Sequence, residues 1–344
     1  MSKLQGFDPS AAARPGSGVF GLPCGREASA VVLMPVPFDA TTSYRPGTAQ
    51  GPAAVLAASA QVDLFDRRFG RIYERGIYML PESPEIRELN ASASEAARPI
   101  VEAGGAEEGS HAEELELVRR ACERVESLVH EHTARALREG KVPGLVGGEH
   151  SVPLGAIRAA VEAHPGLGIL HIDAHMDLRD AFEGFQYSHA SIMHNVLTKL
   201  PGVAKLVQVG IRDFSEDELS FARSHGARVE THFDDVWAEQ MLDGAGFSHL
   251  CQQAVNALPK DVYVSFDIDA LDPSLCPHTG TPVPGGLSFN QAAILLDTLR
   301  KSGRRVVAFD LVEVAPGHDE GPETDANVGA RVLYKLCGIS HVRG

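Results

Sequence analysis

The chain has 344 residues, 44% of them hydrophobic, and its 46 acidic and 31 basic side chains give a formal net charge of −15. This charge argues against a nucleic-acid partner, because phosphates repel it, and it would steer a cationic small substrate, although solubility alone would also account for it. Five scattered cysteines without a C-x-x-C pair, and no run near about 18 apolar residues, predict a cytoplasmic protein with neither a disulfide framework nor a membrane segment.

The chain is expected to form one domain after an N-terminal arm. Residues 1–29 are rich in Gly, Pro, Ala and Ser and are interpreted as a flexible arm. Residues 30–344 are interpreted as a single domain, because no Gly/Pro-rich linker divides the second half. Within it, residues 81–112 fit neither the helical nor the strand period. That segment is interpreted as a surface insertion with one or two helical turns.

Apolar runs alternate with amphipathic segments through most of the domain. The expected strands are 30–39, 76–80, 141–148, 166–173, 204–211, 227–233, 262–269 and 306–314. The expected helices are 113–139, 151–163, 189–200, 215–226, 246–258, 290–303 and 325–338. Such alternation implies right-handed crossovers and a parallel sheet covered on both faces. The sequence therefore predicts an α/β fold, a three-layer α/β/α sandwich.

Polar motifs follow three of the expected strands. They are GGEH (147–150), DAHMD (173–177) and SFDID (265–269). In parallel sheets, ligands gather at the carboxyl ends of the strands. The three motifs are therefore expected to open on the same edge of the sheet and to form one site.

Asp173, His175 and Asp177 alternate at the end of an apolar strand. They share one side, because strand side chains alternate. Unpaired, they would be costly beside a core, and a divalent cation removes that cost. Their ligand atoms suit Mn²⁺, Fe²⁺, Co²⁺, Ni²⁺ or Zn²⁺, and the oxygen-rich mixture favours Mn²⁺. On spacing alone, a solvated loop is an equal alternative.

The same pattern recurs at Asp267 and Asp269, after the apolar run VYVSF. Two carboxylates that leave a buried strand on one side are hard to explain as a solvated loop. With His150 at the end of LVGGEH, the motifs supply four Asp and two His. That number is too large for a single open catalytic ion and indicates two ions, about 3.5–4 Å apart, that share carboxylates and a bridging water.

Three nearby polar residues are given structural roles. His171 lies deeper in the strand than the metal motif and is expected to be a hydrogen-bonded core histidine. Glu149 points away from its neighbour His150 in an extended chain. Asp272 precedes a proline and is expected in a turn.

The motifs GGEHS, DAHMDLRD, YSHAS, SFDIDALDPSLCPHTGTPVPGGLS and DLVEVAP resemble, in this order, those of the ureohydrolase (arginase/agmatinase) family. The resemblance runs from about residue 31 to the C-terminal helix. It implies an arginase-like sandwich around a mostly parallel, eight-stranded sheet. It also implies a metal-dependent hydrolase that acts on linear amidines.

The family's two-manganese site carries over onto residues that match its motifs, with Ni²⁺, Co²⁺ or Fe²⁺ as other possible ions. These ligands are His150, Asp173, His175, Asp177, Asp267 and Asp269. By the resemblance, Asp173 and Asp267 would bridge the ions, and Asp177 counts among the catalytic residues.

Three further residues match family positions that handle the substrate. His189 in YSHAS matches a proton-shuttling histidine, and it is also placed to begin a helix. Glu313 in LVEV matches the carboxylate that pairs with the substrate guanidinium, with an isolated charge at a strand end as the plainer alternative. Thr281 matches a loop that lines the guanidinium pocket.

The substrate's other end is expected to be an amine. The arginase loop that ends in G-N-x-H-G is absent, and LRDAFEGFQYSHAS stands in its place. Residues 37–59 resemble the agmatinase opening and would place a loop near the site mouth. Agmatine, cleaved to putrescine and urea, is therefore the expected substrate. Arg179 could instead bind an acidic substrate tail, or pair with Asp180 or Glu183.

Several alternatives stay open at this point. Guanidinobutyrase, guanidinopropionase, guanidine hydrolase and arginase have nearly the same metal motifs. A formimidoyl or amide hydrolase on the same scaffold, and an inactive metal-binding subunit, are further alternatives. The resemblance also implies a homo-oligomer, either a trimer or a hexamer.

Overall fold

The structure is a computed structural model that describes residues 6–14, 16–107, 109–317 and 323–341. Its centre is one eight-stranded sheet with the order β2-β1-β3-β8-β7-β4-β5-β6, and all neighbouring strands pair in parallel. The strands are β1 (Val31–Val36), β2 (Ile77–Met79), β3 (Val142–Gly147), β4 (Gly168–Ile172), β5 (Lys205–Ile211), β6 (Val229–Phe233), β7 (Asp261–Asp267) and β8 (Arg305–Val312). Each falls on an expected apolar run.

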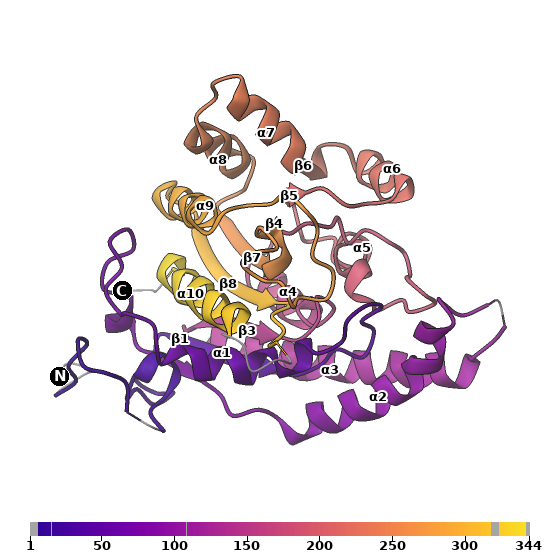
Figure 1. The fold of residues 1–344 in the computed structure, drawn as a ribbon, viewed down its shortest axis with the longest axis horizontal. Coiled ribbons are helices and arrows are strands. Elements are labelled where there is room, and N and C mark those ends of the chain that lie inside the picture. The colour runs from indigo at the N-terminus through magenta and orange to yellow at the C-terminus, as the bar shows by residue number, and fades with distance from the viewer. Residues whose placement is uncertain (1–5, 15, 108, 318–322, 342–344) are drawn as a thin grey trace.

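Helices cover both faces of this sheet, which confirms the three-layer α/β/α architecture (Figure 1). One layer contains α1 (Gly51–Ser59), α8 (Phe247–Asn256), α9 (Phe289–Lys301) and α10 (Thr324–Ile339). The other contains α2 (Pro84–Glu102), α3 (Ala112–Arg138), α4 (Leu154–Ala163) and α5 (Ile192–Lys199). Beside the edge strand β6 lie α6 (Glu216–Ser224) and α7 (Asp234–Leu242).

The central strands are buried on both faces, so their sequences are continuous apolar runs rather than alternating ones. Neighbouring residues of β7 pack into opposite layers, with Val262 and Val264 in one core and Tyr263 in the other. The edge strand β6 is only half-buried. Within the described ranges, no helix combines the length and the apolar character needed to cross a bilayer.

The segment 81–112 differs from its expected structure, because it contains the 19-residue helix α2. Its buried residues Ile86, Ala93, Ala97 and Ile100 follow helical spacing and belong to the core beneath α3. Figure 1 shows α2 and α3 side by side. Alanines occupy half of these buried positions, so the apolar face is too weak to stand out in a hydrophobicity pattern.

Three other segments also differ from the expected structures. The short helices α1 and α7 lie where no helix was expected. In the expected arm, Val19, Phe20 and Leu22 are almost fully buried in the core beside α1 and α10. The expectation of a loose arm is therefore wrong for this part, whereas residues 1–5 and 15 lie outside the described residues.

If α2 is part of the core, Ile86→Ala should lower the free energy of unfolding by about 2–5 kcal/mol, because it leaves a cavity in place of a fully buried side chain. Glu88→Ala, on the exposed side of the same helix, is the control and should change stability by less than about 0.5 kcal/mol. Urea unfolding followed by circular dichroism measures both. Equal, small effects would show that α2 does not pack as described.

Candidate metal centre and active site

The polar motifs meet because of the strand order. The strands β3, β8, β7 and β4 are consecutive in the sheet, although β3 and β8 are far apart in the sequence. All run in parallel, so their carboxyl ends lie along one edge. This edge carries His150 after β3, Glu313 after β8, Asp267 at the end of β7, and Asp173 after β4. The expected single site is thus formed by four adjacent strand ends.

The imidazole of His150 is the centre of a first cluster. Its Nδ1 atom lies 2.9 Å from Asp173 Oδ2, 3.1 Å from Asp177 Oδ2 and 3.2 Å from Asp267 Oδ2. All four side chains are buried. Although it is this close to three carboxylates, Nδ1 makes no hydrogen bond of acceptable geometry with the described residues. Ligand atoms of His150, Asp173 and Asp177 lie within 4.8 Å of one another, together with one of His171, which is close enough to hold a cation.

A second cluster shares Asp173 with the first. His175 Nδ1 lies 3.1 Å from Asp269 Oδ2 and 3.5 Å from Asp173 Oδ1. The two oxygens of Asp173 thus face different histidines, Oδ2 toward His150 and Oδ1 toward His175. Ligand atoms of Asp173, His175 and Asp269 lie close enough together to hold one ion. The residues present fit two cations joined by one carboxylate.

A row of hydrogen-bonded polar residues crosses the sheet beneath the clusters. Thr231, Gln208, His171, Ser265 and Asp310 occupy matching register positions on β6, β5, β4, β7 and β8. Thr231 Oγ1 donates to Gln208 Oε1 at 3.0 Å, and Gln208 Nε2 donates to His171 Nδ1 at 3.0 Å. Ser265 Oγ lies 2.9 Å from Asp310 Oδ2. Such groups are tolerated inside a sheet because they are hydrogen-bonded.

This row assigns the tautomers of two histidines. His171 accepts at Nδ1, so its Nε2 carries the hydrogen and donates to Asp173 Oδ2 at 2.8 Å. His171 is therefore a hydrogen-bonded core histidine, as expected. His150 Nε2 donates to Ser265 Oγ at 2.9 Å, because the Ser265 hydroxyl itself donates to Asp310. In the neutral form of His150, the lone pair would then be on Nδ1, where a metal ligand needs it.

Burial and mutual repulsion shift the carboxylates of the site. Burial, and then the charge of Asp173, raise the pKa of Asp177 to about 6. Burial and the neighbouring Asp269 raise the pKa of Asp267 well above its usual range. Burial acts in the same direction on Asp173, but three histidines, His171 first, hold its pKa well below the usual range. Asp173 thus ionises at a lower pH than Asp177 and Asp267 do.

The two histidines that face the carboxylates respond in the opposite way. Burial lowers the pKa of His150, but Asp173, Asp177 and Asp267 raise it well above its usual range. Burial also lowers the pKa of His175, but Asp269 and Asp173 together raise it well above its usual range. In the protein alone, protons on imidazoles therefore balance the carboxylates. Divalent cations would displace these protons, because a metal ligand must be deprotonated.

A cavity of about 180 Å³ opens above the clusters. It is lined by Ser43, His150, His175, Asp177, Arg179, Phe182, His189, Ala190, Asp213, Phe214, Glu218, Asp267, Asp269, Thr281 and Glu313. Eight of the nine residues singled out for the site line it, and Asp173 lies fully buried beneath its floor. This volume admits a substrate of a few heavy atoms at the clusters.

The three residues matched to substrate handling all reach this cavity. Glu313 is buried, and its Oε1 accepts a hydrogen bond from the His150 amide at 2.7 Å. Burial raises the pKa of Glu313 well above its usual range, and the charge of Glu149 adds to this. Burial also lowers the pKa of His189 to about 4. Thr281 Oγ1 lies 3.5 Å from Asp269 Oδ2.

Two of these carboxylate residues have a left-handed backbone, with φ of 55° at Asp177 and 63° at Glu313. Such a conformation costs a non-glycine residue about 1–3 kcal/mol and is concentrated at functional sites. Hydrogen bonds hold both turns. The Met193 amide donates to Asp177 O at 3.0 Å, the Glu313 amide donates to Gly148 O at 2.8 Å, and Thr279 Oγ1 donates to Glu313 O at 2.8 Å. Both carboxylates are thereby aimed by their main chain.

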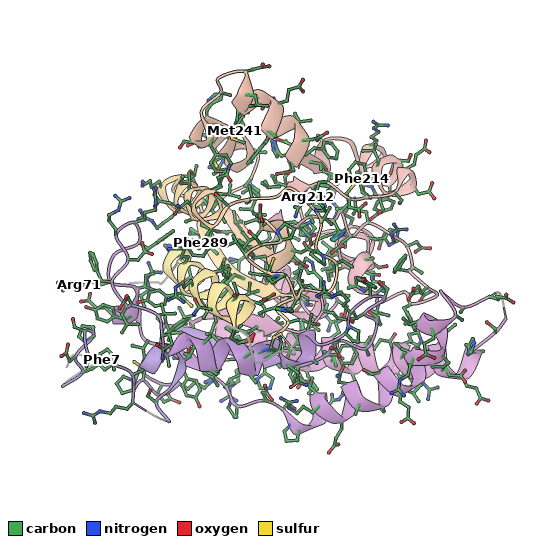
Figure 2. The ribbon with its side chains drawn as sticks, in the orientation of Figure 1. Phe7, Arg71, Arg212, Phe214, Met241 and Phe289 are labelled. Atoms are coloured by element: carbon green, nitrogen blue, oxygen red, sulfur yellow. The ribbon has the colours of Figure 1, made fainter. Side chains whose placement is uncertain are left out.

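The loop that carries Asp269 and Thr281 is held to the end of β5 by Arg212. The guanidinium of Arg212 donates to the carbonyls of Asp269 at 2.7 Å, Leu271 at 3.2 Å and Val283 at 3.0 Å. Arg212 lies near the middle of the molecule in Figure 2, with Phe214 close to it. The Arg212 guanidinium therefore joins two neighbouring walls of the cavity, and all of these hydrogen bonds are to backbone oxygens.

Arg179 makes different contacts from those expected. Its Nε lies 3.5 Å from Glu218 Oε2, and its guanidinium is 4.8 Å from the ring centre of Phe182. The expected pairing with Asp180 or Glu183 is wrong. Arg179 lines the cavity mouth with its side chain about one-third exposed, so it is accessible from the cavity.

Several residues near the site were not found by sequence reasoning. Thr41 and Ser43 lie in the loop after β1, and they reach His189 and the cavity. Asp213, Phe214 and the buried acceptor Glu218 follow β5. Ligands gather at the carboxyl ends of parallel strands, and this rule would have pointed to the residues after β1 and after β5 as well, had it been applied to every strand. The expected position of segment 37–59 near the site mouth is confirmed by Ser43.

Comparisons with known proteins agree with this geometry. The Arginase family model matches residues 29–338. The N(1)-aminopropylagmatine ureohydrolase of Thermus thermophilus is 35% identical over 318 residues, which are 91% of this chain and 91% of that protein. An agmatinase of Bacillus anthracis is 29% identical over 316 residues, 91% of this chain and 92% of that protein. The solved structure of proclavaminate amidino hydrolase from Streptomyces clavuligerus has a TM-score of 0.72 at 25% identity, and the match covers 96% of this chain and 98% of that one.

The sandwich, the clustered ligand atoms at its central strand ends and these matches together define a metal-dependent hydrolase that acts on linear amidines. The chain belongs to the arginase family. Its expected resemblance to agmatinase-type members is confirmed.

We predict that the metal-free protein becomes less stable as the pH rises from about 6.5 to about 8. Burial raises the pKa of Glu149 to about 7, and burial also raises the pKa values of Asp267 and Glu313 well above their usual ranges. A group with a raised folded pKa contributes stability below its ordinary pKa and loses it as the pH passes the folded value. The lowered pKa of His189 acts oppositely, but only below its ordinary value of 6.5.

Chemical denaturation in a chelator at both pH values measures this slope, and the same series with Mn²⁺ should show a smaller one, because the ions neutralise the carboxylates. A metal-free protein whose stability is constant or rises over this range would contradict the described burial of the site.

Proposed function

We propose that this chain hydrolyses the guanidinium group of an amine-ended substrate, with agmatine first among the candidates, to give putrescine and urea. One molecule of water is consumed for each C–N bond broken. The observation that carries the proposal is the pair of ligand clusters that share Asp173, at the strand ends where the family motifs lie. We further propose that residues 30–344 form the single catalytic domain, with residues 19–22 packed on its core, and that segment 81–112 is an insertion at its surface whose helix α2 buries one face.

The proposed metal ligands divide between two Mn²⁺ ions, with Ni²⁺, Co²⁺ or Fe²⁺ as substitutes. His150, Asp177 and both bridging carboxylates, Asp173 and Asp267, would hold the first ion. His175, Asp269 and the same bridging pair would hold the second. When bound, the ions would supply a hydroxide near neutral pH by lowering the pKa of a water molecule. The position of His150 Nδ1, which faces oxygens of three carboxylates and would lose its proton to a bound metal, supports this assignment.

Two residues of the chain would handle the substrate directly. Glu313 is buried beside the His150 cluster, so its carboxylate can pair with a planar guanidinium through two hydrogen bonds. The substrate charge would then keep Glu313 ionised, although burial alone favours its protonated form. His189 would pass a proton to the departing amine, and its lowered pKa makes its protonated form a strong acid. Thr281 would close the guanidinium pocket.

The mouth of the cavity supports an amine at the other end of the substrate. Asp213 is exposed there and has no cationic partner among the described residues, so its charge is available to an ammonium group. Glu218 is less available, because its oxygens accept hydrogen bonds from the Leu178 and Ser215 amides. A relative with the name N(1)-aminopropylagmatine ureohydrolase supports amine-ended substrates longer than agmatine as well.

One observation favours a second candidate, a carboxylate-ended guanidine such as guanidinobutyrate or guanidinopropionate. Arg179 lines the same mouth, held by Phe182 and by Glu218. A guanidinium can bind a carboxylate through two parallel hydrogen bonds. Arg179 and Asp213 thus favour opposite substrate charges, and kinetics with both kinds of substrate decide between them.

We also propose a cytoplasmic homo-oligomer, a trimer or a hexamer, that acts in polyamine biosynthesis. The five cysteines are buried, and no disulfide joins them in the described part of the chain, which suits a reducing compartment. The net charge of −15 supports a small cationic substrate over a nucleic acid.

If Asp173 joins two ions, Asp173→Ala should remove both bound metal and urea production, because each cluster loses a ligand. Asp180→Ala is the control, since its side chain is 92% exposed and lies outside both clusters. Elemental analysis gives the metal content, and a colorimetric assay gives urea. Urea production by metal-depleted Asp173→Ala protein would refute the two-metal proposal.

A substrate panel tests the assignment of the amine end. Agmatine or N(1)-aminopropylagmatine should give the highest kcat/KM, above arginine, guanidinobutyrate, guanidinopropionate and guanidine. Asp213→Asn should raise KM for agmatine about 2- to 5-fold, the effect of an exposed ion pair, with kcat unchanged. Asp217→Asn, which is exposed and outside the cavity, is the control.

Preference for guanidinobutyrate, lost in Arg179→Ala, would establish the second candidate instead. Formamide or another acid in place of urea would indicate a different amidine chemistry. No product from any guanidine, with metal bound, would leave only a binding role for the chain.

A further inference from the structure

We propose that Glu149 is a positioning residue for proton transfer, and that it acts on His189 through the hydroxyl and the main chain of Thr41. The proposal rests on the role given to His189 in the proposed function. Sequence reasoning left Glu149 as a structural neighbour of His150, and the cavity does not expose it. Its effect on the reaction would therefore be entirely indirect.

Glu149 is fully buried, and hydrogen bonds rather than ion pairs surround its carboxylate. No cationic side chain of the described residues pairs with it. Its Oε2 accepts from the Thr41 amide at 2.9 Å and from Thr42 Oγ1 at 3.3 Å. Its Oε1 accepts from Thr41 Oγ1 at 2.8 Å and from Ser151 Oγ at 2.6 Å. A buried carboxylate of this kind is costly unless every oxygen is satisfied, and the loop after β1 supplies most of the donors.

The loop after β1 lies in close contact with the main chain at Gly148 and Glu149. The Glu149 amide donates to Phe38 O at 2.9 Å. At Gly148, an added Cβ would lie 2.0 Å from the same oxygen, so only glycine allows this approach. The carboxylate then fixes the next turn at Thr41. The position of the Thr41 main chain is therefore set from β3 rather than by the loop alone.

Glu149 fixes the direction in which the Thr41 hydroxyl donates its hydrogen bond. It donates to Glu149 Oε1, since a carboxylate offers no hydrogen. Its oxygen is then free to accept, and the His189 amide donates to it at 3.3 Å. A continuous path of hydrogen bonds leads from the His189 main chain through Thr41 to the buried charge.

The main-chain carbonyl of Thr41 sets the tautomer of His189. His189 Nδ1 lies 3.0 Å from Thr41 O, and a carbonyl can only accept, so Nδ1 carries the hydrogen. The lone pair is then on Nε2, which lies 3.4 Å from Ser43 Oγ, on the cavity wall. A histidine that delivers a proton to a substrate needs its exchangeable site on that side. Glu149 thus holds the two groups of Thr41 that orient and polarise His189.

The variants Thr41→Val, Thr41→Ser and Glu149→Gln test the proposal in the metal-loaded enzyme. Thr41→Val keeps the shape but removes the hydroxyl, and Thr41→Ser restores it. Thr42→Val is the matched control, because it also removes a hydrogen bond to Glu149, whereas Thr42 makes no hydrogen bond to His189 in the described structure. Metal content and circular dichroism show whether each variant is folded.

Thr41→Val and Glu149→Gln should lower kcat about tenfold or more, because a misoriented His189 would lose part of the rate that an acid–base group contributes. KM should stay within about twofold of the wild-type value. Thr41→Ser should recover most of the loss, and Thr42→Val should stay within about twofold of the wild type. Glu149→Gln puts an amide donor where the loop requires an acceptor, so it should affect kcat at least as strongly. Equal losses in Thr41→Val and Thr42→Val would overturn the proposal.

Nitrogen NMR of histidine-labelled, metal-free protein gives a readout that does not depend on activity. His189, assigned by difference with His189→Gln, should show a single tautomer with hydrogen on Nδ1. Glu149→Gln should convert it to a mixture, and Thr42→Val should not. An unchanged tautomer in a folded Glu149→Gln protein would refute the positioning role.

The two proposals fail in different ways. Wild-type turnover in His189→Ala would remove the shuttle from the proposed function, whatever the NMR shows. Slow turnover in His189→Ala with normal turnover in folded Thr41→Val and Glu149→Gln would keep the shuttle and overturn only the part given to Glu149.

Discussion

Mutual repulsion among buried carboxylates is the constraint around which this molecule is organised. Four buried aspartates from two strand ends converge on two imidazoles at the floor of the cavity. The protein alone meets this cost with protonated histidines and with a row of hydrogen-bonded residues beneath the site. Apolar cores on both faces of the sheet surround these hydrogen-bonded residues, so stability and site geometry depend on the same packing.

The site divides into a rigid floor and a set of loops. The floor consists of strand ends, where main-chain pairing fixes each side chain. The walls are loops, and each is tied to the floor by one strong group: the Arg212 guanidinium on backbone oxygens, and the Glu149 carboxylate on the loop after β1. Floors of this kind can stay constant while the walls change, which fits a family whose members act on different guanidines.

The sheet and the metal floor could be predicted from the sequence because each rests on a strong local pattern. The central strands are continuous apolar runs, and the cluster residues follow three of them directly. Helix α2 was missed because alanines make up half of its buried face, and Val19 and Phe20 were missed because glycine and proline around them resemble a linker. The relation of Glu149 to Thr41 joins residues 108 positions apart, so no local pattern contains it. The contacts of Arg179 likewise depend on where a distant helix begins.

The place of β8 in the sheet has a consequence for the biogenesis of the enzyme. This strand is the last of the sheet along the chain, yet it lies between β3 and β7 at the centre. While a ribosome is still making the chain, β3 and β7 have no common neighbour, and their ligand groups cannot be brought together. Pairing across such long separations is slow, and exposed strand edges invite aggregation meanwhile. The cluster around His150 therefore forms only after β8 has been made, whereas the cluster around His175 comes from β4 and β7, which pair directly.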